Sequence, residues 1–587
     1  MVRLIIIFLL VGQQCLGQII SPERRVDWTK AGLSKIHVEP ERIVTIEQFG
    51  GKGDGLVVNN KALEEAISSF GEKGGLIQFG EGEYLFNKSF HVSDSIVLQG
   101  LGSDVTIIKF AQPASGDLIQ VKGRLKGTPY DVSTSALKGQ QYIISSFSNN
   151  VSPWDYFKIS KIDSALITSD WALGTVGQIV RVTEIRGDTL KIDAPLRLDY
   201  PLETDPKIQQ IVPCCNVGIE CMRIRRGVND AFQSSTILME YATNCYINGV
   251  EMDSCNYAHV TFSASSHCAV RNSYFHDAYS YGGGGKGYGI MVQNTSGDCL
   301  IENNIFRHLR HSMILQAGSN GNVFGYNYSI DPYWTEVSLP SNAAGDIVLH
   351  GNYVYANLFE GNLGQQIVID DSHGINGPYN TFFRNRLELY GIFMNNNPAT
   401  NDVNFVGNEV TNSAFTYGLY LLSGKNHFQY ANNIRGTVTP TGTENLNDTS
   451  YYLRIKPNFL QQTSQYPVIG SPNVFKSGEI PAKLNYIKNQ PTSCSEDSTM
   501  VASYPTSSNY SVLIYPNPVG QIIFLKGLNS VGGKVDISIY NSEGRLVQER
   551  KGLHTESSIE VSTLVTGFYI VRIRDTNKNY IGRFVKL

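Results

Sequence analysis

An apolar residue recurs about every 23 residues through the middle of the chain, and this period constrains the fold more than any other feature. An asparagine stands three residues after most of these positions, among glycines and β-branched residues. Such repeats predict a solenoid of stacked β coils, with asparagines that hydrogen-bond from coil to coil. The apolar positions are Tyr246, Ala269, Ile301, Phe324, Phe359, Phe382, Phe405 and Phe428, and the positions three residues later are Gly249, Asn272, Asn304, Asn327, Asn362, Asn385, Asn408 and Ala431.

The composition agrees with a fold of strands and turns. The 587 residues include 56 glycines, 32 tyrosines and 26 phenylalanines, which favour strands and turns over long helices. Charged residues make up 17%, and the net charge of −4 has no basic block, so nucleic acid is not an expected partner. We therefore predict an all-β chain in which residues 18–487 form the solenoid.

The first residues predict a secretory signal. Arg3 precedes an apolar run, and Cys15 and Gly17 follow at the spacing of a signal-peptidase site, so we predict a signal peptide at residues 1–17. The apolar run is too short to cross a bilayer, and no later segment is long enough, so we predict no transmembrane segment.

Eight cysteines remain after this cleavage, in a compartment that permits disulfides. Their spacing does not assign pairs. Cys245 and Cys268 fall one coil apart in one column, either as stacked thiols or as a disulfide. The spacing of the cysteines and histidines predicts no structural zinc site.

The end of the chain differs in composition from the repeat. Residues 488–510 are rich in Ser, Thr, Pro and Asn and predict a linker, and the short alternating strands of residues 511–587 predict a small β-sandwich. The motifs "YPNP" at Tyr515–Pro518 and "GFYIVRI" at Gly567–Ile573, with Lys586 near the end, resemble the C-terminal sorting domain of type IX (Por) secretion in Bacteroidetes. This resemblance implies export by the type IX machinery, and then release or attachment at the cell surface. A carbohydrate-binding sandwich is the alternative.

The segment before the repeat predicts a cap for the solenoid. The apolar residues of "NNKALEEAISSFG" fall on one helical face, with Asn60 as the expected N-cap and Gly71 as the expected end. This entry segment resembles the pectate-lyase superfamily of right-handed parallel β-helices, in which such a helix covers the open apolar end. The resemblance covers roughly residues 44–480. Residues of about 125–205 break the period and predict hairpins inserted beside the helix.

Several strands of the repeat end in a polar residue, which alternation places on the outer face. Because adjacent coils lie about 4.8 Å apart, we expect His350 and Asp370 to be neighbours in one row. Asp371 and His373 extend the cluster at the strand end. The predicted catalytic residues are Asp370, Asp371, His350 and His373, and the predicted substrate-binding residues are Gln293, Gln316, Arg310, Trp334, Arg384, Asn395, Glu240 and Glu360; no metal ligand is predicted.

A row of planar polar groups suits a sugar polymer, and two reactions compete. Hydrolysis needs one protonated and one ionised carboxyl group, and repulsion between Asp370 and Asp371 would raise the pKa of one of them. β-Elimination on a uronate needs a cation, Arg310 or Arg384, and a histidine as base, and it could use calcium.

The known families match this cluster only in part. Polygalacturonases share "DD" at 370–371 and "RIK" at 454–456, but "NTD" is absent and "SHG" at 372–374 follows "DD" at once. The "WIDH" and "RxPxxR" motifs of pectate lyases are absent, so neither family's catalytic roles are transferred. We predict a secreted enzyme that cleaves an extracellular polysaccharide. Glycoside hydrolysis without a cofactor is favoured, β-elimination is the alternative, and a non-catalytic glycan-binding adhesin is the third hypothesis.

Overall fold

The structure of the chain is a computed structural model that divides into two compact units, Met1–Ala502 and Ser503–Leu587. The predicted signal peptide and most of the predicted linker lie outside the described residues. The described residues are 19–34, 42–111, 116–147, 151–229, 233–336, 344–370, 372–395, 398–414, 416–454, 456–460, 466–467, 469–470, 475–494, 509–511, 513–526, 534–541, 546–554, 558–574 and 579–587.

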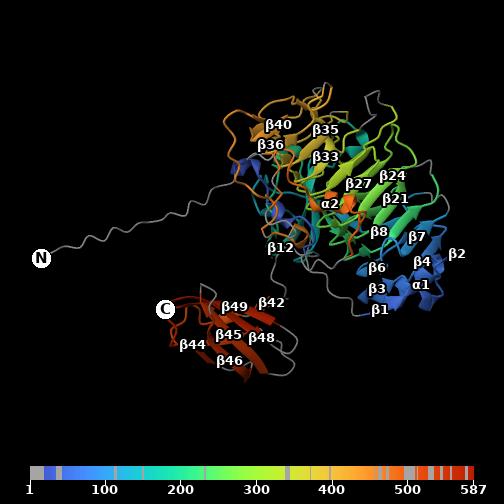
Figure 1. Cartoon of the computed structure of the whole chain (residues 1–587). Helices are drawn as coiled ribbons and strands as arrows, with labels where there is room; N and C mark the ends of the chain where they lie inside the picture. Colours follow the sequence, from blue (N-terminus) through green and yellow to red (C-terminus); the bar gives the residue numbers. More distant parts are fainter. Residues whose placement is uncertain are drawn as a thin grey trace, which may run out of the picture. The chain divides into compact units, whose positions relative to one another are not determined.

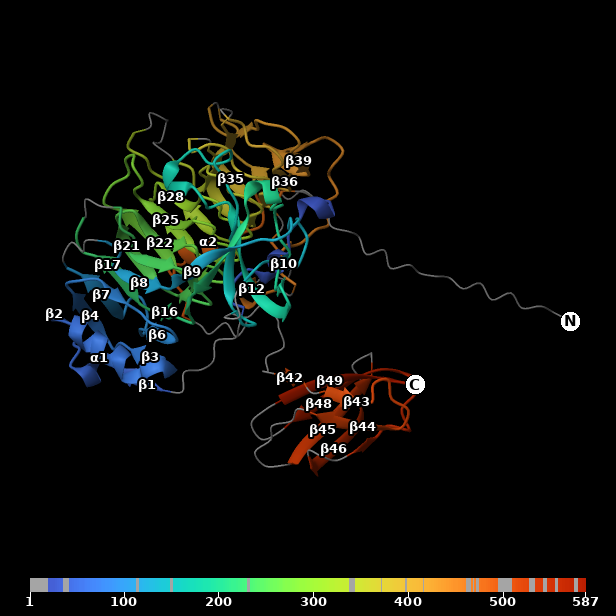
Figure 2. The same cartoon turned by 180° about the vertical axis from the view of Figure 1, so that it is seen from behind.

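The first unit is a parallel β-helix, as predicted (Figures 1 and 2). A 12-stranded sheet of short strands such as β20 (Tyr246–Asn248) forms one side of the coil. Each coil then adds two consecutive strands to a group of 21, for example β21 (Glu251–Cys255) and β22 (Ala258–Ser263). Strand β21 pairs with β24 (Tyr274–Ala278) and β22 with β25 (Tyr288–Gln293), so one full turn of chain separates neighbouring strands.

The phenylalanine column holds through the centre of the repeat. The rings of Phe324, Phe359, Phe382 and Phe405 stack with successive centroid distances of 5.1, 4.9 and 5.5 Å. The predicted register is wrong by one residue at both ends. Tyr246 and Ala269 align with Leu300 rather than Ile301, and Phe428 aligns with Asn404 rather than Phe405. The period alone does not fix the register where the side chains are not phenylalanine, and a one-residue slip reverses the face of the strand.

An asparagine ladder joins the coils at the turn that follows the 12-stranded sheet. Asn362 Oδ1 accepts from the backbone N and from Nδ2 of Asn327, at 3.0 and 2.9 Å, and Asn362 Nδ2 donates to Asn385 Oδ1 at 2.9 Å. The ladder comprises Asn304, Asn327, Asn362, Asn385, Asn408 and Asn432. One predicted member is wrong, because Ser273 rather than Asn272 donates its backbone N–H to Asn304. At the other end the ladder extends to Asn432, one residue after the repeat position Ala431.

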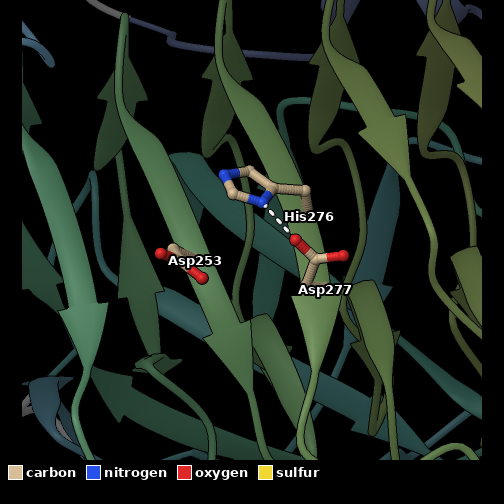
Figure 3. Close-up of side chains that lie close together, drawn as sticks. All are labelled: Asp253, His276 and Asp277. Atoms are coloured by element: carbon tan, nitrogen blue, oxygen red, sulfur yellow. Dashed lines mark hydrogen bonds and ion pairs between the residues drawn. The ribbon is translucent and has the colours of Figure 1, made fainter.

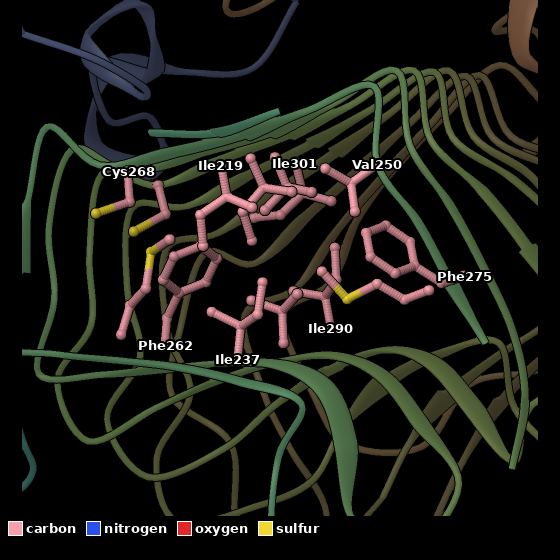
Figure 4. Close-up of a cluster of buried hydrophobic side chains, with 14 of the residues drawn as sticks. Ile219, Ile237, Val250, Phe262, Cys268, Phe275, Ile290 and Ile301 are labelled. Atoms are coloured by element: carbon pink, nitrogen blue, oxygen red, sulfur yellow. The ribbon is translucent and has the colours of Figure 1, made fainter. Parts of the chain in front are cut away.

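The interior of the coil is filled by isoleucine, valine and phenylalanine side chains (Figure 4). Cys245 and Cys268 lie in this core with Cys299, and all three are buried free thiols, so of the two alternatives the structure has the stacked thiols. A buried free cysteine packs as a small apolar side chain.

Helix α1 (Asn60–Phe70) covers the N-terminal end of the core. Leu63, Ala66 and Phe70 are buried in the same apolar cluster as the first coils. The helix begins one residue earlier than predicted, because Asn59 rather than Asn60 is the N-cap, and it stops, as predicted, before Gly71, whose φ is +60°.

The predicted inserted hairpins form an antiparallel sheet beside the helix (Figure 2). This sheet packs on the turns of the coil, where Gly177 O accepts from Asn320 Nδ2 at 3.0 Å and from Tyr355 Oη at 2.6 Å. Its strands are β9 (Arg124–Asp131), β10 (Tyr142–Ile144), β11 (Tyr156–Ser160), β12 (Gly177–Arg186), β13 (Thr189–Ile192) and β14 (Lys207–Val212).

The second unit has two small sheets around an apolar core, as predicted for a β-sandwich. One sheet has the order β42-β49-β48-β45-β46 and the other the order β43-β44-β47. In the described part of the chain, none of the helices has the length and apolar character needed to cross a membrane. The strands are β42 (Asn509–Ser511), β43 (Leu513–Tyr515), β44 (Ile522–Lys526), β45 (Lys534–Asn541), β46 (Leu546–His554), β47 (Ile559–Glu560), β48 (Gly567–Arg574) and β49 (Asn579–Lys586).

Candidate functional site

One register line on the outer face of the β-helix carries a continuous row of polar side chains. The line passes through the ends of β18 (Ile237–Glu240), β22, β25, β28 (His311–Leu315), β31 (Ile347–Leu349), β33 (Leu363–Ile369) and β35 (Arg386–Met394). The paired strands place Glu240, Ser263, Gln293, Gln316, His350, Asp370 and Asn395 at successive positions of this row.

His350 and Asp370 form a hydrogen-bonded pair in the row, between Gln316 and Asn395. His350 Nδ1 lies 2.6 Å from Asp370 Oδ2, and the two side chains are 12% and 17% exposed. Ser372 donates to Asp370 through its backbone N at 2.9 Å and through Oγ at 2.8 Å, and Asn395 Nδ2 lies 3.3 Å from Asp370 Oδ1. Burial opposes ionisation, but the hydrogen bonds from His350 and Ser372 outweigh it and hold the pKa of Asp370 well below its ordinary value.

Asp370 is therefore ionised at neutral pH and is not a protonated acid. The hypothesis that mutual repulsion makes one of the two neighbouring aspartates an acid fails for Asp370, because four donor contacts favour its charged form. Its predicted partner Asp371 lies outside the described residues.

His373 lies against this pair. Its ring meets the ring of His350 edge to face, with centroids 4.7 Å apart, and its Nδ1 is 3.0 Å from Ser169 Oγ. Gly351, with a φ of +73°, permits this approach, since a Cβ there would lie 2.6 Å from the carbonyl oxygen of His373. Burial and the neighbouring His350 lower the pKa of His373, so its ring is neutral at neutral pH.

A cation and aromatic rings border the row. The Arg310 guanidinium lies 4.7 Å from the Trp334 ring centre and 5.7 Å from that of Tyr288, and its Nη1 donates to Gly282 O at 2.8 Å. Arg310 is 7% exposed, and its Nε has no hydrogen-bond partner among the residues described. Tyr288 stacks on His311 at 5.2 Å. Burial and the nearby Asp370 raise the pKa of Tyr288, and Arg310 opposes this shift.

The rest of the row contains amides and one exposed ion pair. Gln316 Nε2 donates to Gln293 Oε1 at 2.7 Å, two coils below Asp370. Glu240 lies further along, where Lys122 Nζ is 3.9 Å from its Oε2. Amide groups that bond to one another across coils hold their remaining donors and acceptors in fixed directions.

Two predicted binding residues do not belong to the row. Arg384 is buried, and its guanidinium donates to the carbonyls of Leu446, Asp448 and Ile469. Glu360 is 1% exposed and accepts from Tyr451 N at 2.8 Å, and burial raises its pKa to about 8. Both side chains fasten the later segment that covers the 12-stranded sheet, so their prediction as substrate-binding residues is wrong.

A second charged cluster lies on the strand that precedes the row in each coil (Figure 3). Among the residues described, Asp253, His276 and Asp277 could offer a metal ion ligand atoms within 4.8 Å of one another. These groups are already paired, since Arg225 Nε lies 3.2 Å from Asp253, and Arg307 Nη2 lies 3.0 Å from Asp277. Their arrangement fits an ion-pair network better than a cation site, because the arginines compensate the carboxylates.

This cluster predicts a pH-dependent contribution to stability. Burial opposes protonation of His276, but hydrogen bonds from its Nδ1 to Asp277 at 2.8 Å and from its Nε2 to Glu251 at 3.0 Å raise its pKa above the ordinary 6.5. The stability gained is fully present below pH 6.5 and is lost as the pH rises through the raised pKa. Unfolding midpoints of the wild type should fall over this range, whereas those of His276→Asn should change less. The exposed His91→Asn variant is the control, and an unchanged pH slope in His276→Asn would contradict the assignment.

Sequence reasoning did not find four residues beside the row. Tyr257 and Tyr288 lie where strands begin, and their rings are 5.5 Å apart. The repeat marked the polar residues at strand ends but not these tyrosines at strand beginnings. Ser169 and Trp171 come from the inserted sheet, whose position against the helix has no sequence signal.

Comparisons with known proteins agree with both units. Residues 284–434 match the family model described as "Right handed beta helix region", and residues 513–587 match the one described as "Secretion system C-terminal sorting domain". The chain is a right-handed parallel β-helix protein with a secretion sorting domain. Its C-terminal domain marks it as a secreted protein that can be attached at the cell surface.

Solved β-helix structures resemble this β-helix protein at low identity. Tailspike gp61 of Pseudomonas phage phi297 is 14% identical with a TM-score of 0.48, over 67% of this chain and 65% of the tailspike. The mannuronan C-5 epimerase AlgE6 A-module of Azotobacter vinelandii is 13% identical (TM-score 0.33; 66% and 95% of the two chains). An exopolygalacturonase of Thermotoga maritima is 12% identical (TM-score 0.31; 68% and 94%). No curated protein sequence matches the chain.

Proposed function

We propose that this protein cleaves an acidic extracellular polysaccharide by β-elimination on the outer face of the β-helix. The observation that carries the proposal is the His350–Asp370 pair in the polar row, in which His350 Nδ1 lies 2.6 Å from Asp370 Oδ2. Because Asp370 is ionised and can only accept, His350 Nδ1 is the donor, and the other ring nitrogen, Nε2, is the one that can take a proton from substrate.

The surrounding residues supply the other requirements of elimination. His350 Nε2 takes the proton from the carbon next to the carboxylate, a C=C bond forms, and the C–O bond to the neighbouring sugar breaks; the leaving oxygen takes up a proton from the protonated His350 or from water. A cation must neutralise the carboxylate as negative charge develops on it. Arg310 is the cation beside the row, and its buried Nε has no partner in the described structure. His373, which is neutral, and Asn395 lie on the Asp370 side of His350, where they can hydrogen-bond the hydroxyls of a neighbouring sugar.

Hydrolysis is the second candidate. The adjacent carboxyl groups of Asp370 and Asp371 in the sequence favour it, with Asp370 as the ionised member and Asp371 as the acid. This reaction would leave no double bond in the product.

Product analysis distinguishes the candidates. The purified chain, incubated with polygalacturonate, alginate and a panel of neutral plant and algal polysaccharides, should release products that absorb in the ultraviolet as unsaturated uronates do. New reducing ends without this absorbance would identify a hydrolase and contradict the proposed elimination. Retained binding without any product would identify a glycan-binding adhesin.

A further inference from the structure

We infer that the inserted sheet supplies a sugar-binding subsite, in which Trp171 stacks on the pyranose ring next to the one that reacts at His350. This inference rests on the proposed function and names a binding residue for it. Trp171 lies in the short 3-10 helix Asp170–Ala172, within the loop that joins β11 to β12.

The loop is fixed to the β-helix at the site. Asn352, two residues after His350, accepts from the backbone N of Thr168 at 3.2 Å, and Ser169 Oγ lies 3.0 Å from His373 Nδ1. Thr295 Oγ1 donates to Thr175 O at 2.6 Å at the other end of the loop. Thr295, Asn352 and His373 belong to three different coils of the helix, so the fold sets the position of the loop beside the polar row.

The loop is also held rigid from within. The buried Asp163 accepts from Gly174 N and from Val176 N, each at 2.9 Å, and so closes the loop upon itself. Ala172, next to Trp171, is completely buried in the core of the inserted sheet. A rigid loop loses little conformational entropy when a ligand binds to it.

Trp171 itself is 53% exposed, although Ser169 and Ala172 beside it are held against the β-helix and the inserted sheet. Its ring meets that of His373 at 80° and a centroid distance of 5.9 Å, so the indole stands edge-on to the histidine. A large apolar ring left half in water beside a row of polar groups indicates a ligand that has both an apolar face and polar edges. A pyranose ring has this character, because its C–H groups gather on its faces and its hydroxyls lie around its rim.

Affinity electrophoresis in gels that contain polygalacturonate or alginate tests the inference through binding alone. We expect Trp171→Ala to raise the dissociation constant about tenfold or more, as truncation of a central tryptophan does. Trp171→Phe, which keeps an aromatic face, should restore most of the affinity. Trp154→Ala is the matched control, since Trp154 is 62% exposed on the same inserted sheet and should not affect binding.

The outcomes separate this inference from the proposed function. Equal affinities of the wild type and Trp171→Ala would overturn the subsite, as would a wild type that neither polymer retards. Equal losses in Trp171→Ala and Trp154→Ala would also overturn it, because they would indicate a general effect on the inserted sheet. A wild type that binds through Trp171 but releases no product would support the subsite and contradict the proposed cleavage.

Discussion

Asp370→Asn should lower the rate of polysaccharide cleavage by about 10²–10⁴-fold, the range in which a positioned acid or base contributes. The asparagine side chain fills the same space but has no charge, and its amide can donate toward His350 as well as accept. The proton of His350 is then no longer fixed on Nδ1, because the partner is no longer an obligatory acceptor, and it can move to Nε2. With a proton on Nε2, His350 cannot take one from the substrate. The measurement is the initial rate of product release from the polymer that the wild type cleaves.

Stability and binding must be followed in the same variant. Loss of charged hydrogen bonds at Asp370 should cost about 1.5–3 kcal/mol, which leaves a large β-helix folded. Asp253→Asn is the matched control, because Asp253 is 20% exposed, also has a lowered pKa, and lies on a different strand of the coil. We expect it to lose a similar amount of stability and to keep the wild-type rate. Full activity in Asp370→Asn would refute the assignment of the catalytic pair.

The sequence predicted the row because the repeat determines which residues share a face. Once the 23-residue period is recognised, alternation along a strand and the spacing of coils bring His350 next to Asp370, although 19 residues separate them. The same reasoning fails for the ionisation of Asp370. Its pKa depends on donors from Ser372 and His350, whose directions follow from turn geometry and not from the period.

Arg384 and Glu360 show a second limit of the sequence. Glu360 ends a strand of the 12-stranded sheet and Arg384 lies in the turn after one, so the sequence placed both at the surface. In the structure, Leu446, Asp448, Tyr451 and Ile469 of a later segment pack over the sheet and bury them. The sequence of this covering segment does not follow the 23-residue repeat, so it does not indicate where the segment packs. Trp171 was missed for the same reason, since an inserted sheet can pack on any side of a helix as far as its own sequence indicates.

Asn362→Ala should destabilise the β-helix by about 3 kcal/mol or more, the largest effect on stability that we expect from one substitution. Asn362 Oδ1 accepts from the backbone N and from Nδ2 of Asn327, and Asn362 Nδ2 donates to Phe324 O at 2.8 Å and to Asn385 Oδ1. Alanine would remove four hydrogen bonds. The backbone N–H of Asn327 would lose its side-chain acceptor, and Asn327 Nδ2, Phe324 O and Asn385 Oδ1 would each lose one bond; a lost buried hydrogen bond costs about 1–3 kcal/mol where it leaves a group unsatisfied. Water cannot replace the side chain because the position is 1% exposed.

The midpoint of chemical unfolding, followed by circular dichroism, measures this effect. Asn87→Ala is the control, because Asn87 is exposed at the N-terminal end of the same unit and should change the midpoint little. Asn362→Asp tests the ladder itself: a carboxylate still accepts from Asn327 but cannot donate to Asn385 or to Phe324 O, and it buries a charge, so it should be at least as damaging as alanine. If both variants at position 362 unfold at the wild-type midpoint, the asparagine ladder does not hold the coils together, and apolar stacking in the phenylalanine column must carry that role alone.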